Sequence, residues 1–197
     1  MNKVWADLLT QARALHQAVP ALSSFCPFPE IIPQDGFEPH TDPLCDALQA
    51  DSTLSGPHSA FQTACLHAAP HAKWRDTYRD TPIGEVLHAH FGTFEILGRD
   101  TPLQTDTMRG FLIYQTPGYY YPLHHHPAEE IYLVLAGEAD FVVEDGETRR
   151  LGPGDTSFHA SNQPHALTTT DRSILANVLW RGDIDIKPVF TYPKRLS

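Results

Sequence analysis

The sequence GYYYPLHHHPAEEIYLVLAG, residues 118–137, decides the fold of this chain. It has the form G-x5-H-x-H-x3-E-x6-G, with the spaced histidines at His124 and His126 and the carboxylate at Glu130. Alternate residues of a β-strand face the same side, so these two imidazoles point together and His125 points away. The stretch therefore predicts two consecutive strands whose polar side chains converge on one point.

A second segment supplies a further imidazole. The turn sequence GPGD, residues 152–155, leads to His165. Glu130 opens a predicted strand in which Tyr132 shares its face. A closed β-barrel would bring His165 to this face from a strand that is distant in sequence. Three imidazoles and one carboxylate that meet in this way predict a metal site.

The types of ligand narrow the choice of metal. Neutral imidazole together with carboxylate suits first-row divalent ions such as zinc, iron and manganese, and the residues do not choose among them. A structural zinc site is more often rich in cysteine, whereas this chain has no C-x2-C pair. An open site of the catalytic type is favoured, and a barrel that binds a metal without catalysis is the alternative.

The two segments resemble the two cupin motifs, over residues 115–170. His159 departs from the usual cupin pattern, and the sequence leaves open whether it faces the cavity. The resemblance implies a mainly β protein built on a small antiparallel β-barrel, the double-stranded β-helix. It also implies one metal ion held by His124, His126, Glu130 and His165.

Helices are expected before the barrel. Apolar residues with a period near 3.6 predict a helix over residues 3–19. Asp42 followed by Pro43 has the form of a helix start, and residues 59–68 also read as helical. The stretch 20–40 contains five prolines and predicts a loop.

From about residue 84 the pattern changes to short apolar runs separated by turn signals, which favours a barrel. At 197 residues the chain suits one domain, or a core domain with an appendage. We expect a helical N-terminal region over residues 1–82, packed on a metal-binding barrel domain over residues 83–197. The expected strands are 85–91, 93–97, 110–116, 130–136, 138–144, 147–151, 156–159, 165–170, 173–180 and 188–192.

Composition excludes several classes of partner. The formal net charge of −10, without a cluster of basic residues, argues against nucleic-acid binding. No apolar run approaches the ~18 residues of a membrane span.

The three scattered cysteines predict reduced thiols and a cytoplasmic location. The oligomeric state is open, and a homodimer that pairs barrel edges is one alternative.

A narrower resemblance rests on the runs GYYYP (118–122), HHHPAEEIY (124–132) and LAGEADF (135–141). Together with the helical region and the chain length, they resemble the cupin-type lyases that cleave dimethylsulfoniopropionate. This family implies a metal-dependent β-elimination on a small zwitterionic substrate, which yields dimethyl sulfide and acrylate. The metal would bind the substrate carboxylate, and a base would remove a proton from the adjacent carbon.

The resemblance also implies roles for individual residues. Tyr132 is the first candidate for the catalytic base, and Tyr121 is the second. Strict alternation along the strand would turn Tyr120 inward instead, unless Pro122 bends the strand. Aromatic faces would hold the sulfonium group by cation–π attraction. The predicted substrate contacts are Tyr120, His124 and Trp180.

Two alternatives stay open. The family pattern also fits a ligand set of His126, Glu130 and His165 with Tyr132, so either His124 or Tyr132 completes the set. The runner-up function is a cupin dioxygenase of a small thiol or diketone, which would need ferrous iron and oxygen. A third is a cupin without catalysis, or of the isomerase type, that binds a sugar or a small acid.

Overall fold

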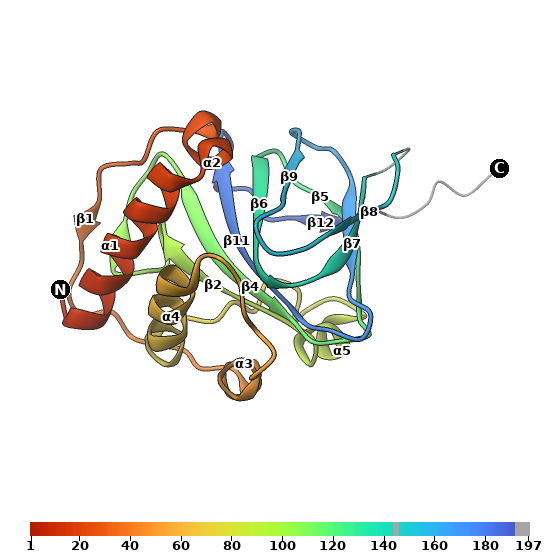
Figure 1. The fold of residues 1–197 in the computed structure, drawn as a ribbon, viewed down its shortest axis with the longest axis horizontal. Coiled ribbons are helices and arrows are strands. Elements are labelled where there is room, and N and C mark those ends of the chain that lie inside the picture. Colours follow the sequence, from red (N-terminus) through yellow and green to blue (C-terminus); the bar gives the residue numbers. More distant parts are fainter. Residues whose placement is uncertain (144–145, 192–197) are drawn as a thin grey trace.

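The computed structural model describes residues 1–143 and 146–191, and it contains two facing five-stranded antiparallel sheets (Figure 1). The first sheet has the order β2-β4-β11-β6-β9 and the second has the order β12-β5-β10-β7-β8. This arrangement is the cupin barrel that the sequence predicts. The strands are β2 (Phe91–Leu97), β4 (Arg109–Gln115), β5 (Tyr120–His125), β6 (Glu129–Gly137), β7 (Ala139–Val143), β8 (Arg149–Leu151), β9 (Thr156–His159), β10 (His165–Thr168), β11 (Ile174–Arg181) and β12 (Val189–Phe190). A small separate sheet pairs β1 (Ile32–Pro33) with β3 (Leu103–Gln104).

The predicted helices form, and two of them have side-chain caps, of which the Asp42 cap was predicted. In α1 (Lys3–Ala18) the Asn2 side chain accepts a hydrogen bond from the backbone N–H of Trp5, at 3.2 Å. In α3 (Pro43–Ala50) the side chain of Asp42 accepts from Leu44 N–H, at 2.8 Å. Each bond satisfies a backbone donor that the first helical turn leaves without a partner. The remaining helices are α2 (Pro20–Phe25), α4 (Ser59–Ala68), the short 3-10 helix η1 (Ala69–His71) and α5 (Gly84–His88).

Two local predictions were wrong. The stretch 20–40 is not all loop, because Pro20 occupies the first turn of α2, where proline is tolerated. The strand expected at 85–91 is instead the helix α5, and β2 begins only at Phe91. Within this segment Leu87 is fully buried while Val86 is 59% exposed. One buried residue per turn suits a short surface helix, and the sequence run is too short to tell the two apart.

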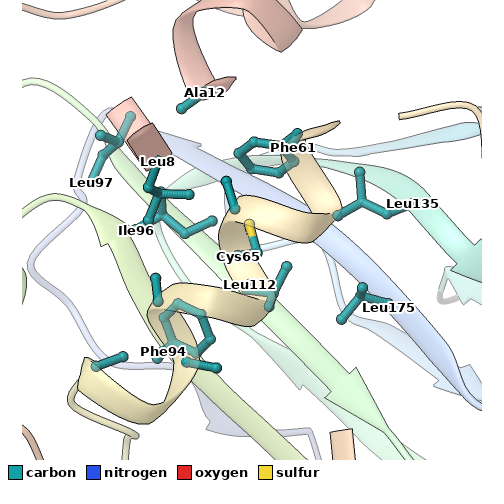
Figure 2. Close-up of a cluster of buried hydrophobic side chains, with 14 of the residues drawn as sticks. Leu8, Ala12, Phe61, Cys65, Phe94, Ile96, Leu97, Leu112, Leu135 and Leu175 are labelled. Atoms are coloured by element: carbon teal, nitrogen blue, oxygen red, sulfur yellow. The ribbon is translucent and has the colours of Figure 1, made fainter. Parts of the chain in front are cut away.

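The first sheet is buried on both faces, which explains why its strands read as nearly continuous apolar runs. On β6, Ile131 and Leu133 belong to a core cluster shared with the helices, whereas Tyr132 and Val134 belong to the cluster between the two sheets. Figure 2 shows the helix-facing cluster, in which Leu8, Phe61 and Cys65 pack on sheet residues including Phe94, Leu112 and Leu135. The helices α1 and α4 thus cover the outer face of this sheet and leave the inner face to the site.

The turn after β6 requires glycine. Gly137 has φ +73°, and a Cβ at this position would lie 1.8 Å from the carbonyl oxygen of Ser173. Only glycine meets both conditions without strain. The second glycine of the motif therefore allows the chain to reverse tightly from β6 into β7, which carries it from one sheet to the other.

The cysteines and the membrane-span prediction can be checked against the described residues, whereas other expectations cannot. Cys26, Cys45 and Cys65 carry free thiols, and no helix in the described ranges is long and apolar enough to cross a bilayer. The cytoplasmic location, the homodimer and the division at residue 82 stay predictions. The ends of the strands expected at 138–144 and 188–192 lie outside the described residues.

Candidate metal centre and its cavity

Three side chains from both sheets meet in the barrel interior. His126 follows β5, Glu130 lies on β6 and His165 opens β10, and donor atoms of all three lie within 4.8 Å of one another. The Glu130 carboxylate is 2.9 Å from His165 Nε2 through Oε2 and 3.5 Å from His126 Nε2 through Oε1. All three residues are at most 3% exposed. Two of the three predicted imidazoles thus meet the predicted carboxylate.

The two imidazoles present lone pairs to the carboxylate. His126 Nδ1 lies 2.9 Å from the carbonyl oxygen of Ala128, and His165 Nδ1 lies 2.8 Å from that of Gln163. A carbonyl only accepts, so each Nδ1 carries the hydrogen and each neutral ring leaves Nε2 without one. Both Nε2 atoms are buried and have no hydrogen-bond partner.

This arrangement fits a cation. Two nitrogen lone pairs that face a carboxylate repel it, and buried polar atoms rarely stay without a partner. A divalent ion between them would accept all three donors, while the backbone carbonyls orient the rings from behind. The residues present therefore suit a metal of the type expected from the sequence.

The strand register holds Glu130 between two further side chains. His159 on β9 and Trp180 on β11 are its direct cross-strand neighbours on either side. His159 Nδ1 donates to Glu130 Oε2 at 3.0 Å, and the Trp180 indole N–H donates to Oε1 at 2.6 Å. Ser157 lies 3.0 Å from His159 Nε2 and can donate its hydroxyl there. Both carboxylate oxygens are thus fixed in position.

Charge states in the centre are set by burial and by these contacts. Burial alone would raise the pKa of Glu130, but the neighbouring His165, together with the close approach of His126 and His159, outweighs it and holds that pKa well below its usual value. Burial, and after it the neighbouring His165, lowers the pKa of His124 well below its usual value. The same two causes lower the pKa of His159 by a smaller amount. An ionised carboxylate among neutral imidazoles is the state that metal ligands require.

His124 lies beside the three-residue cluster. It pairs with His165 across the β5–β10 register, and the two ring centroids are 4.2 Å apart. Its ring centroid lies 6.4 Å from that of His126. His124 Nδ1 faces the carbonyl oxygen of Pro122 at 2.8 Å, and the side chain lines the cavity. This position suits either a fourth ligand or a contact to a bound molecule.

A β-bulge decides which tyrosine faces inward. His165 pairs with His124, but Leu167 pairs with Tyr121, so β5 carries one extra residue in the stretch that contains Pro122. Tyr121 is therefore 3% exposed, while Tyr120 is 49% exposed. Since Tyr120 does not line the cavity, we leave it out of the proposed substrate contacts.

The two inward tyrosines differ in their hydrogen bonds. Tyr121 shares a 2.6 Å hydrogen bond with the hydroxyl of Tyr78, and its ring stacks on Phe91. Tyr132 has no hydrogen bond within the part of the chain that the structure describes, and its ring centroid lies 5.4 Å from that of His159. Burial raises the pKa of both phenols well above the usual value. The neighbouring Tyr78 raises the pKa of Tyr121 further, and Glu130 does the same for Tyr132.

A narrow cavity of about 40 Å³ opens beside the centre, with room for only a few ordered waters. Glu130 and His124 line one part of it, and Arg75 and Thr77 line another. Its aromatic walls are Tyr78, Phe91, Phe111, Tyr121, Tyr132 and Trp180. Trp180, a predicted substrate contact, lines the cavity, and its N–H donates to Glu130.

The sequence did not reveal three of these residues. His159 was noticed without a role, because only the register with Glu130 shows that it faces inward. Tyr78 and Arg75 come from the segment between η1 and α5, which carries no motif. No local pattern could have placed them, since their approach to the cavity depends on how that segment crosses the open side of the barrel.

Similar proteins share the sequence and the fold of this chain over most of its length. The model of the dimethylsulfoniopropionate lyase family matches residues 32–176. The chain is 40% identical over 194 residues to dimethylsulfoniopropionate lyase DddQ of Ruegeria pomeroyi. The aligned residues are 98% of this chain and 96% of that protein. The crystal structure of the lyase DddQ from Ruegeria pomeroyi DSS-3 matches with a TM-score of 0.94 at 39% identity, over 98% of this chain and 99% of the other. A crystal structure from work on the lyases RdDddP and RnDddQII matches with a TM-score of 0.90 at 34% identity, over 96% and 98%.

Proposed function

Because this chain belongs to the dimethylsulfoniopropionate lyase family, we propose that it is a metal-dependent carbon–sulfur lyase that splits dimethylsulfoniopropionate into dimethyl sulfide and acrylate. The observation that carries the proposal is the buried group of His126, Glu130 and His165, with two unpartnered imidazole nitrogens, beside an aromatic cavity. These three residues would hold the ion, with His124 or Tyr132 as the fourth ligand. When bound, a divalent zinc, iron or manganese ion would polarise the substrate carboxylate, acidify the adjacent C–H bond and lower the pKa of a neighbouring phenol.

Tyr132 is our first choice for the base. It lies on the same face of β6 as Glu130, lines the cavity, and has no hydrogen bond within the described residues that would occupy its hydroxyl. As phenolate, it would take the proton from the carbon next to the carboxylate. The electrons of that C–H bond would form the C=C bond of acrylate, and the C–S bond would break to release neutral dimethyl sulfide.

Tyr121 is the second choice. Its hydroxyl is already bonded to Tyr78 at 2.6 Å. A tyrosine in such a pair has less freedom to turn toward a substrate. The pair is well placed to support the wall of the cavity, and it keeps Tyr121 against His124, with ring centroids 4.1 Å apart.

The aromatic walls suit the sulfonium group. A cation over an aromatic face gains about 0.5–2 kcal/mol, more where water is excluded. Trp180 and the tyrosines offer such faces, and His124 is neutral because burial and His165 lower its pKa. A neutral imidazole at this position would not repel a cationic substrate.

The proposal is tested by adding dimethylsulfoniopropionate to the purified protein and measuring dimethyl sulfide in the headspace. The reaction should run without oxygen and stop with a chelator. Turnover that depends strictly on ferrous iron and oxygen, with a small thiol or diketone as substrate, would select the dioxygenase instead. Binding of a sugar or small acid without turnover would select a cupin that is not a lyase.

A further inference from the structure

Arg75 lies at the boundary between the inner cavity and an outer cleft. It lines the cavity beside the metal centre together with Thr77, and the same two residues also line an open cleft of about 610 Å³ on the surface. Its backbone N–H donates to the carbonyl oxygen of Thr93 on β2 at 2.9 Å, which ties the residue to the edge of the first sheet. A molecule that passes from the cleft to the cavity would meet this side chain.

The guanidinium of Arg75 has no carboxylate partner in the described ranges 1–143 and 146–191. It lies 4.8 Å from the ring centroid of Phe111, and Arg109 lies 5.2 Å from the same ring. The nearby carboxylate of Glu95 is already occupied, because it accepts hydrogen bonds from Arg109 and from the backbone N–H of Asp100. Glu95 therefore pairs with Arg109, and the Arg75 guanidinium has no ion pair within the described residues.

Burying the charge of Arg75 costs free energy, because no carboxylate within the described residues pairs with it directly. Burial, followed by the charge of Arg109, lowers the pKa of Arg75, although a guanidinium stays protonated in proteins. An incoming anion would relieve this penalty. A carboxylate would also match the planar fork of N–H donors, with which arginine binds carboxylates through two parallel hydrogen bonds.

We propose that Arg75 recognises the carboxylate of the zwitterionic substrate where the outer cleft meets the inner cavity, and so selects carboxylates for entry. This inference rests on the proposed function. The other end of the substrate carries a positive charge, which Arg75 repels. The sulfonium would therefore point away from Arg75, toward the aromatic walls, while bare cations would be disfavoured.

The test measures binding of propionate, which has the carboxylate but neither sulfonium nor reactivity, to the full-length protein as purified. In Arg75→Gln its dissociation constant should rise about 10- to 100-fold, the scale of a lost charge-assisted pair. Arg75→Lys keeps the charge but not the fork of N–H donors, so the dissociation constant of propionate should rise less in this variant. If Arg75→Gln does not fold, Arg75→Lys provides the test. Ethyldimethylsulfonium, which has the cation without the carboxylate, should bind Arg75→Gln no more weakly than wild type.

Lys187→Gln is the matched control, because Lys187 lines the cleft but not the cavity. It should change propionate affinity less than about twofold. Unchanged propionate affinity in both Arg75 variants would overturn the inference, as would an equal loss in Lys187→Gln or an equal loss of ethyldimethylsulfonium binding. A wild-type protein that releases no dimethyl sulfide would instead count against the proposed function, since the propionate comparison needs no turnover.

Discussion

Glu130 on β6 and His159 on β9 face each other across the strand register, and His159 Nδ1 donates to Glu130 Oε2 at 3.0 Å. The remaining nitrogen of His159 contacts Ser157, so its ring is held at both ends. His159 therefore acts on the centre through Glu130, as a positioning residue.

Replacing His159 tests this role. His159→Ala should weaken metal binding about 10- to 100-fold, because outer partners of a ligand fix its orientation. Ser157→Ala should have a smaller effect, since it removes only the bond behind the ring. Competition with a chelator of known affinity measures both, and wild-type metal affinity in His159→Ala would remove the residue from this role.

The histidine triplet provides its own control for the ligand assignment. His126→Ala and His165→Ala should lose metal and lyase activity together, because each removes one of three convergent donors. His125→Ala should keep both, since His125 Nδ1 contacts Thr191 instead of the centre. Elemental analysis of the purified variants gives the readout, and retained stoichiometric metal in either ligand variant would contradict the assignment.

Variants of the tyrosines that flank the histidines should differ in lyase activity. Tyr132→Phe should keep the fold but lower the rate of elimination by about 10²- to 10⁴-fold, as expected for loss of a general base. Tyr120→Phe is the control, because its side chain is 49% exposed and outside the cavity, and it should stay within about twofold. Headspace dimethyl sulfide measures both.

Tyr121→Phe distinguishes the two candidates for the base. If Tyr121 only supports the cavity wall through Tyr78, the variant should retain measurable turnover and a normal metal content. A loss of turnover as complete as that of Tyr132→Phe, with metal and melting temperature unchanged, would transfer the role of base to Tyr121.

Asp51 predicts a pH-dependent link between the helical region and the barrel. At the end of α3, its carboxylate accepts hydrogen bonds from Tyr114 and Ser173. Burial alone would raise the pKa of Asp51, but the bonds from Ser173, Thr53 and Tyr114 lower it. A depressed folded pKa stabilises the protein above the unfolded pKa of about 3.9, and this stabilisation is lost as pH falls through the folded value.

Asp51→Asn should therefore lower the free energy of unfolding at pH 7 by about 1 kcal/mol, the scale of hydrogen bonds to a partly exposed charged group. The difference from wild type should shrink as the pH falls below about 4. Urea unfolding followed by tryptophan fluorescence measures it. A difference that is constant from pH 7 to pH 3.5 would show that the charge of Asp51 has no part in the effect.

The amino-acid sequence alone determined the barrel and the donors of its centre. Spacing within residues 118–137 placed two imidazoles on one face, because the side chains of a strand alternate and a two-residue step keeps the face. The closed barrel and the part played by His165 came from the resemblance to the cupin motifs. The cluster of His126, Glu130 and His165 follows from that local geometry once the strands pair. The aromatic nature of the cavity was predicted for the same reason.

Only the tertiary structure decided which neighbours reach that centre. Because of the bulge in β5, Tyr121 faces the cavity and Tyr120 faces outward. The β6–β9 register brings His159 to Glu130. Arg75 reaches the cavity from a segment outside the barrel motifs. These placements depend on one-residue shifts and on how distant segments cross, and such long-range packing leaves no periodic signal in the chain.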